Sequence, residues 1–152
     1  MASNIRAGVI GAGTISGAHL PVLSALDGIA LTCICDIRPE RAKAAAEKYG
    51  CEYTTDWEAL VAREDIDSVH VLTPHYLHAR MAIACLEAGK HALTEKPMAS
   101  ELVDARRMIA VSREHPELKL GVIFQNRYNP ATRSEEHTSE LQSPNNLVCR
   151  LL

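Results

Sequence analysis

The sequence has no long apolar segment and no large excess of one charge. No apolar run approaches the length of a membrane span, and the A-G-V-I-G-A-G stretch after Arg6 lacks the length and the cleavage site of a secretory signal. The formal net charge is −3, with both signs interspersed, so the chain has no field that would attract nucleic acid or an anionic membrane surface. We therefore expect a cytoplasmic protein with neither of these partners.

Metal-binding or redox cysteine motifs are also missing. The five cysteines form no C-x-x-C pair, and Cys33 and Cys35 would share one face of an extended strand, so we interpret them as reduced packing residues. Solenoid repeats are absent as well. At 152 residues and 47% hydrophobic content, the chain can bury about one sizeable core, which predicts a single domain.

Short apolar runs alternate with longer helical patterns, as is typical of βαβ units around a parallel sheet. The expected strands are residues 5–10, 30–35, a short strand around Tyr53, 68–73, 91–94 and 119–124. The expected helices are residues 14–26, 39–49, 57–61, 76–87 and 100–114, with Pro39 and Asp56 at helix starts and Gly50 and Gly89 at helix ends. The predicted fold class is α/β, a Rossmann fold with a doubly wound parallel sheet.

A glycine-rich turn joins the first predicted strand to the first predicted helix. In G-A-G-T-I-S-G, Gly11 permits a tight turn and Gly13 lets the backbone approach a pyrophosphate at the helix N-terminus. We expect Gly11, Gly13, Thr14 and Ile15 to contact a dinucleotide. The third motif position is Ser16 rather than Gly or Ala, a small departure because Ser still allows close packing.

Asp36 follows the second strand at the distance expected for an acid that accepts hydrogen bonds from a ribose diol. Its carboxylate would repel the extra phosphate of NADP, so NAD is the favoured cofactor and NADP the second candidate. Arg38 could pair with Asp36 or reach an adenine or a phosphate. Alternatively, Asp36 caps the turn into the helix at Pro39.

The segment T-P-H-Y-L-H runs from the end of a strand into the next helix, where open α/β sheets bind ligands. We expect Thr73, Pro74, His75 and His78 to contact the cofactor. Two alternatives stay open for the two histidines: metal ligands, for which no third ligand is near in the sequence, or side chains that hydrogen-bond backbone or water.

Glu95-Lys96-Pro97 ends the following strand. A lysine held on such a turn can approach a substrate hydroxyl, and partial burial could lower its pKa towards a role in proton transfer. The expectation is that Lys96 is catalytic and that Glu95 and Lys96 contact the cofactor. Read alone, Lys96 could also be a solvated lysine.

These signals in this order resemble the N-terminal half of the glucose-fructose oxidoreductase/inositol dehydrogenase/MocA family. The resemblance rests on the G-x-G turn, Asp36, T-P-x-x-x-H, E-K-P and the closing F-Q-N-R-Y-N-P, and it covers about residues 4–132. It implies that Lys96 lies by the reacting carbon and the nicotinamide, that His78 lies near the same end of the pocket, and that Arg127 lies near the nicotinamide end of the cofactor. The implied reaction moves a hydride between nicotinamide and a secondary alcohol of a sugar, polyol or related small carbohydrate.

The resemblance also implies a second α/β domain, which this sequence lacks. In the family that domain forms a wall of the substrate pocket, supplies an Asp/His pair for proton transfer and mediates oligomerisation. We expect residues 1–124 to be the dinucleotide-binding domain and 125–132 to begin the connection to the missing domain. The full-length parent would be a homo-oligomeric enzyme, whereas this chain would bind cofactor weakly and turn over nothing detectable.

Residues 133–152 do not fit the pattern, because they have no sustained apolar period and are dense in Ser, Glu and Asn. Residues 133–143, R-S-E-E-H-T-S-E-L-Q-S, resemble the in-frame translation of a sequencing-adapter oligonucleotide. We interpret residues 133–152 as an artefactual or disordered tail.

Two other function classes remain as alternatives. One is a stand-alone dinucleotide-binding or redox-sensing module without catalysis, which would need an ordered, functional tail. The other is a different Rossmann enzyme, such as a short-chain dehydrogenase or a methyltransferase, but no Y-x-x-x-K occurs and E-K-P would stay unexplained.

Overall fold

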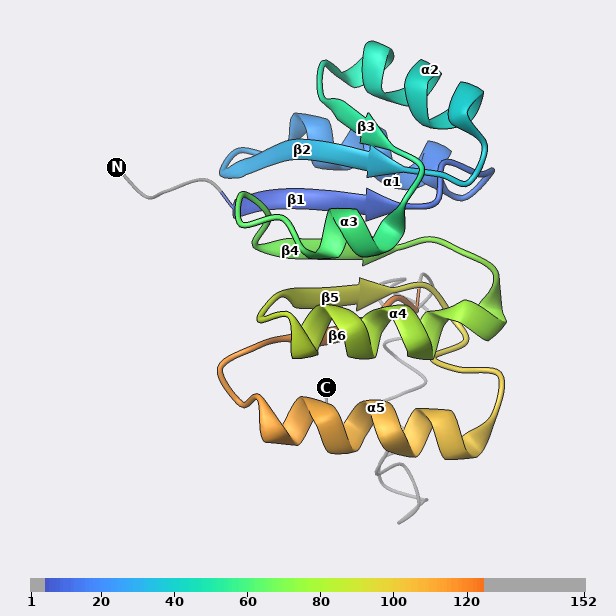
Figure 1. Ribbon diagram of the computed structural model, residues 1–152, viewed down its shortest axis with the longest axis vertical. Coiled ribbons are helices and arrows are strands. Elements are labelled where there is room, and N and C mark those ends of the chain that lie inside the picture. Colours follow the sequence, from blue (N-terminus) through green and yellow to red (C-terminus); the bar gives the residue numbers. More distant parts are fainter. Residues whose placement is uncertain (1–4, 125–152) are drawn as a thin grey trace, which may run out of the picture.

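Apolar runs of the sequence form the strands of one parallel sheet in the computed structural model, which describes residues 5–124 (Figure 1). The strands are β1 (Ile5–Ile10), β2 (Ile29–Cys35), β3 (Glu52–Thr54), β4 (Ser68–Val71), β5 (His91–Thr94) and β6 (Leu120–Val122). The helices are α1 (Ser16–Ala25), α2 (Pro39–Tyr49), α3 (Trp57–Val61), α4 (His75–Glu87) and α5 (Leu102–Glu114).

The strand order is β3-β2-β1-β4-β5-β6, and every neighbouring pair is parallel. The chain therefore builds one half of the sheet outward from β1 and the other half outward from β4. Ligands of open α/β sheets bind at this point of reversal, outside the carboxyl ends of the strands. The predicted Rossmann fold is confirmed.

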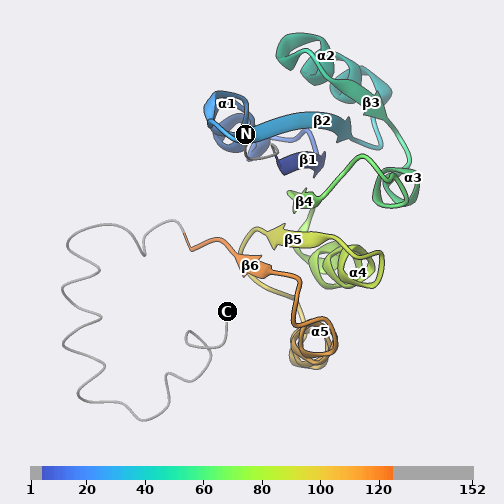
Figure 2. The ribbon, with the colours of Figure 1, turned by 90° about the vertical axis from the view of Figure 1, so that its left-hand side faces the viewer.

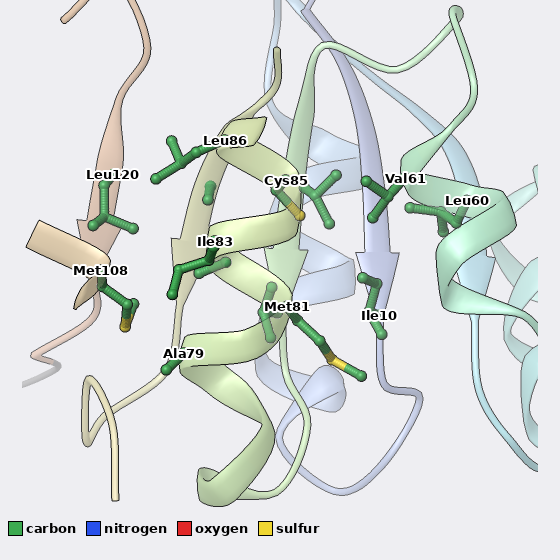
Figure 3. Close-up of a cluster of buried hydrophobic side chains, with 14 of the residues drawn as sticks. Ile10, Leu60, Val61, Ala79, Met81, Ile83, Cys85, Leu86, Met108 and Leu120 are labelled. Atoms are coloured by element: carbon green, nitrogen blue, oxygen red, sulfur yellow. The ribbon is translucent and has the colours of Figure 1, made fainter. Parts of the chain in front are cut away.

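The helices cover the two faces of the sheet unequally. Side chains of α3, α4 and α5 pack on one face, and Figure 2 shows these helices on the side of the sheet opposite α1. Figure 3 shows the core of this face, in which Met81, Cys85 and Leu86 of α4 belong to one cluster with residues of the sheet and of α3 and α5. The other face has a smaller core under α1, and beyond α1 no helix among the described elements covers β5 and β6 on that side.

Alternation along β2 explains the burial of its cysteines. Cys33 and Cys35 point into the larger core, whereas Ile34 between them points into the smaller one. Burial raises the pKa of Cys35 to about 12 and that of Cys85 to about 12, so these thiols stay protonated at neutral pH. Cys33, Cys35, Cys51 and Cys85 are all free, as expected of packing residues.

Most predicted boundaries are confirmed, and the others differ by one or two residues. β1, β5, α2 and α3 have the expected bounds, Asp56 caps α3 by accepting hydrogen bonds from the N–H groups of Glu58 and Ala59, and Gly50 ends α2 at φ 69°. Helix α1 begins at Ser16 rather than Thr14, because the glycine-rich turn occupies the residues before it. Strand β4 ends at Val71, where the chain leaves the sheet towards α4.

Candidate functional site

Two adjoining hollows lie along the carboxyl ends of the strands. The glycine-turn hollow has a volume of about 380 Å³ and contains the predicted residues Gly11, Gly13, Thr14, Ile15, Asp36, Arg38, Thr73 and Pro74. The lysine hollow has a volume of about 750 Å³ and contains His75, His78, Glu95 and Lys96. Ile15 and Thr73 line both hollows, so the structure brings the predicted residues within its described range together along one continuous track.

Gly11 makes the tight turn that ends β1. Its φ is +108°, and a Cβ at this position would lie 2.6 Å from the carbonyl oxygen of Leu72. Its N–H donates to the carbonyl oxygen of Cys35 at 2.7 Å. Only glycine fits here, because a side chain would collide with the backbone that leaves β4.

Gly13 differs from Gly11, because nothing in the folded domain requires a glycine there. Its φ is not positive, and no described atom lies within 4 Å of the Cβ that it lacks. The N–H groups of Gly13, Thr14 and Ile15 donate to no oxygen of residues 5–124. The open space and the free donors lie together at the start of α1.

Helix α1 starts without any negative side chain. Its first turn contains no acidic residue and its N-cap, Ile15, offers no side-chain hydrogen bond. The first turns of α2, α3 and α5 each contain an acid, Glu40, Glu58 and Asp104 respectively, whereas that of α4, like that of α1, contains none. The positive end of the α1 dipole is therefore left uncompensated and can bind an anion.

Asp36 is buried at the end of β2, and its carboxylate holds two backbone groups. Oδ2 accepts from the N–H of Ala12 at 2.8 Å, and Oδ1 accepts from the N–H of Arg38 at 2.9 Å. The second bond reaches the N-cap residue of α2, so Asp36 does cap the turn into that helix, and it also braces the glycine-rich turn. A carboxylate has about four acceptor positions, which leaves capacity for a ligand hydroxyl.

His78 is fully buried beneath the segment that joins β4 to α4. Its Nε2 lies 2.7 Å from the carbonyl oxygen of Thr73, and its Nδ1 lies 2.8 Å from the carbonyl oxygen of Pro97. Both partners are backbone carbonyl oxygens, which accept hydrogen bonds from the ring. Of the interpretations left open by the sequence, the geometry favours hydrogen bonding to the backbone. His75, in contrast, is exposed at the start of α4.

Lys96 is exposed at the end of β5, and its Nζ makes no hydrogen bond or ion pair within residues 5–124. Its neighbour Glu95 is buried. One oxygen of Glu95 lies 2.9 Å from Nε2 of His19, and the other accepts from the N–H of Lys96 at 3.2 Å. Each oxygen of Glu95, which we expected to contact the cofactor, thus has one protein partner.

Sequence reasoning missed two histidines of the lysine hollow, His19 on α1 and His70 on β4. The two rings are edge to face, with centroids 6.3 Å apart. Burial lowers the pKa of His70 to about 4, and its buried Nδ1 has no partner in the part of the chain that the structure describes. The one available signal for His19 was a histidine in an otherwise apolar helix.

Trp57 and Arg41 of the glycine-turn hollow were also missed. Trp57 comes from a helix remote from the motifs in sequence, whereas Arg41 lies one turn of α2 after the predicted Arg38. Arg127 lies outside the described residues, as do residues 125–132 and 133–152. Within residues 5–124, no group of three or more His, Cys, Asp or Glu side chains could hold a metal ion. Of the five helices described, none is long and apolar enough to cross a membrane.

Residues 5–124 match the model of an oxidoreductase family described as having an NAD-binding Rossmann fold. The chain is 37% identical over 128 residues to 4-carboxy-2-hydroxymuconate-6-semialdehyde dehydrogenase from Sphingobium sp., covering 84% of this chain and 40% of the relative. It is 31% identical over 128 residues to inositol 2-dehydrogenase from Salmonella typhimurium, covering 82% of this chain and 38% of the relative.

Solved structures agree with the sequence relatives. A 3-ketoreductase from Actinomadura kijaniata, in complex with NADP and TDP-benzene, superposes with a TM-score of 0.82 at 36% identity. The alignment covers 91% of this chain and 43% of the reductase. The chain thus spans about two fifths of the length of each of these proteins.

Proposed function

The chain belongs to the glucose-fructose oxidoreductase/inositol dehydrogenase/MocA family and contains its NAD-binding Rossmann domain, and from this we propose which residues bind the cofactor and which act on the substrate. The glycine-turn hollow binds the nucleotide part of NAD. The lysine hollow receives the nicotinamide and, in a longer protein, the substrate.

The observation that carries this proposal is the pairing of open space at Gly13 with free N–H groups at the start of α1. The fold explains Gly11 through its φ and its contact with Leu72, but it gives no reason for a glycine at position 13. A pyrophosphate provides one, because it needs close approach to the backbone and unpaired donors. The lack of an acid in the first turn of α1 supports the same proposal, since a carboxylate there would repel the phosphates.

Asp36 favours NAD over NADP in this proposal. Its carboxylate is fixed by Ala12 and Arg38 at the end of β2, where it can accept from a ribose hydroxyl and would repel a phosphate. Arg38 and Arg41 line the same hollow and would offset part of this repulsion. The expected outcome is a preference for NAD with measurable NADP binding.

Lys96 is the residue that we assign to proton transfer. The bound nicotinamide supplies a hydride acceptor or donor, whereas the hydroxyl proton of the alcohol needs a separate acceptor. Lys96 is the cation of the lysine hollow whose amine is not engaged by residues 5–124, so it can donate to or accept from a substrate oxygen.

The substrate is proposed to be a secondary alcohol of a sugar, polyol or related carbohydrate, or the corresponding ketone. Relatives named for inositol oxidation and for 3-ketoreduction support this class. Residues 1–124 form the dinucleotide-binding domain and residues 125–132 begin the connection onward. The face of β5 beyond α1, which includes Leu93 and the exposed Val22 and Leu26 at its border, would receive the rest of the longer protein.

A titration with NADH tests the cofactor site in the 152-residue chain. Trp57 is the sole tryptophan and lines the glycine-turn hollow, so NADH bound there should quench its fluorescence. Gly13→Ala should weaken NADH binding by at least about tenfold, or about 1.4 kcal/mol.

Gly17→Ala is the matched control, because Gly17 is exposed, also has open space at its Cβ position and does not line the hollow. Equal affinities of Gly13→Ala and wild type for NADH would exclude the proposed pyrophosphate position. No quenching by NADH in the wild type would exclude the site as a whole.

A further inference from the structure

The residues on both sides of Lys96 are held by histidines from two helices, the half-buried His19 and the buried His78. Before it, the carboxylate of Glu95 meets His19 from α1, and the two side chains are only 10% and 12% exposed, respectively. After it, the carbonyl oxygen of Pro97 meets His78 from α4, which is 0% exposed. Lys96 itself, between them, is exposed and unpaired within residues 5–124.

We propose that His19 and His78 are positioning residues for Lys96. They fix the E-K-P turn relative to helix α1 and to the segment that joins β4 to α4. This inference rests on the proposed role of Lys96. Neither histidine needs to contact the substrate, because each acts on the residue next to the lysine in the chain.

The contact of His19 connects the lysine turn to the helix that starts at the glycine-rich turn. His19 lies one turn after Ser16, whose hydroxyl donates to the carbonyl oxygen of Gly13 at 2.6 Å. A hydrogen bond between a ring N–H and a carboxylate is among the stronger ones available to a neutral or charged imidazole. Helix α1 and the lysine turn are therefore tied by side chains 76 residues apart in sequence.

The contacts of His78 connect the lysine turn to the strand at which the sheet reverses. The same ring that reaches Pro97 also reaches Thr73, which lines both hollows. A single buried ring thus spans the carboxyl ends of β4 and β5. Together the two histidines connect α1 and the carboxyl ends of β4 and β5 around the amine of Lys96.

The surroundings of His19 leave Glu95 as its one charged partner in the described part of the chain. The other ring close to it is His70, whose low pKa keeps it neutral above about pH 4. Loss of the His19 ring would therefore leave Glu95 buried without a partner for one oxygen. A buried carboxylate in that position would be expected to move towards solvent and to displace the adjacent Lys96.

Nuclear magnetic resonance of the lysines tests this in the 152-residue chain without cofactor. The chain has five lysines, so reductive ¹³C-methylation gives few signals, and Lys96→Arg identifies that of Lys96. His19→Leu should leave the signal of Lys43 on α2, which does not line the lysine hollow, in place and shift that of Lys96 away from its wild-type position. His19→Gln, whose amide can reach the position of Nε2, should restore it, whereas His19→Asn is one methylene shorter and should not.

His115→Leu is the matched control. His115 forms the other His–Glu pair of the described chain, 3.6 Å from Glu117 and remote from the lysine hollow, so its loss should leave the Lys96 signal in place. If His19→Leu does not fold, the comparison of His19→Gln with His19→Asn carries the test. An unchanged Lys96 signal in folded His19→Leu or His19→Asn would overturn the role of His19, and an unchanged signal in folded His78→Leu would overturn that of His78.

The same samples separate this inference from the proposed function. If NADH fails to quench Trp57 in the wild type but His19→Leu still shifts Lys96, the cofactor site is wrong and the positioning contact stands. If NADH binds equally well to wild type and to His19→Leu, the cofactor site is intact in both proteins. In that case we expect NADH to shift the Lys96 signal of the wild type but not that of His19→Leu.

Discussion

The two ends of the parallel sheet differ in whether their polar groups have partners within the protein. At the amino end, Arg6 binds Asp67 through two nitrogens at 3.0 and 2.6 Å, and Arg63 binds both Glu52 and Asp65 at 2.6 Å. At the carboxyl end, the N–H groups of residues 13–15 and the amine of Lys96 have no partner within residues 5–124. The amino-end charges named here bind one another, whereas these carboxyl-end donors are available to a ligand.

Two lysines at opposite ends of β5 show the same difference between the two ends of the sheet. Lys90, just before β5, is buried, and its Nζ donates to the carbonyl oxygens of Arg63 at 2.6 Å and Ile66 at 2.9 Å. Lys96, just after the same strand, is exposed and unpaired in the described chain. Residue type alone therefore does not separate a structural lysine from the one that we propose to be reactive, but the end of the strand does.

The largest expected effect tests whether the carboxyl end also has rigid, ligand-independent parts. Gly11→Ala should destabilise the domain by more than about 3 kcal/mol for two reasons. The new Cβ would lie 2.6 Å from the Leu72 carbonyl oxygen, and the positive φ of this position is unfavourable for alanine. Gly28, at the amino end, also has a positive φ, but no described atom lies within 4 Å of its Cβ position. Gly28→Ala should cost only about 1–2 kcal/mol. Urea unfolding measures both, and equal losses would mean that the contact with Leu72 relaxes freely.

Next in size is the exchange of each lysine for methionine. Lys90→Met leaves two carbonyl oxygens without their donor and should lower the free energy of unfolding by about 2–3 kcal/mol. Lys96→Met should change it by less than about 0.5 kcal/mol, since the side chain is exposed. Urea unfolding again gives both values. A larger loss for Lys96→Met would contradict the division between the two ends.

The fold could be predicted from the sequence because its signals are local. Strands buried on both faces appear as continuous apolar runs, as in residues 7–10, and helix ends are marked by Pro39, Asp56 and Gly50. The glycine-rich turn and E-K-P can likewise be recognised from consecutive residues. Their common location at one edge follows from the parallel sheet, because every strand ends on the same side.

The positioning contacts could not be predicted, because they join residues that no short pattern connects. His19 and Glu95 are 76 residues apart, and His78 meets Pro97 across 19 residues. The role of Asp36 was predicted only in part. Its place after β2 was evident from spacing, but its bond to Ala12 depends on how closely the glycine-rich turn approaches β2.

A carboxylate from each end gives the third and fourth tests. Asp36→Asn should lower the preference for NADH over NADPH by about tenfold, or about 1.4 kcal/mol, because it removes a negative charge facing the ribose. Quenching of Trp57 by each cofactor measures the ratio. Asp27→Asn, at an exposed position, is the control and should leave the ratio unchanged. An unaltered ratio in Asp36→Asn would assign cofactor choice to Arg38 and Arg41 instead.

The smallest effect is expected at the amino end, with Asp67→Asn. The side-chain hydrogen bond from Arg6 lowers the pKa of Asp67 to about 2, below its ordinary value of about 3.9. A carboxyl group whose pKa is lowered by folding stabilises the folded state above its unfolded pKa, and this contribution disappears as the pH falls through the folded pKa. Wild type should therefore be slightly more stable than Asp67→Asn at pH 7, and the difference should shrink below about pH 4 and vanish near pH 2. Both partners are more than one third exposed, so the difference should be small and should decrease with added salt.

Thermal unfolding across this pH range measures the effect of Asp67→Asn, and NADH binding at pH 7 should be the same in both proteins. A change in NADH affinity would show that the amino end is coupled to the cofactor site, and the separation of the two ends would then fail.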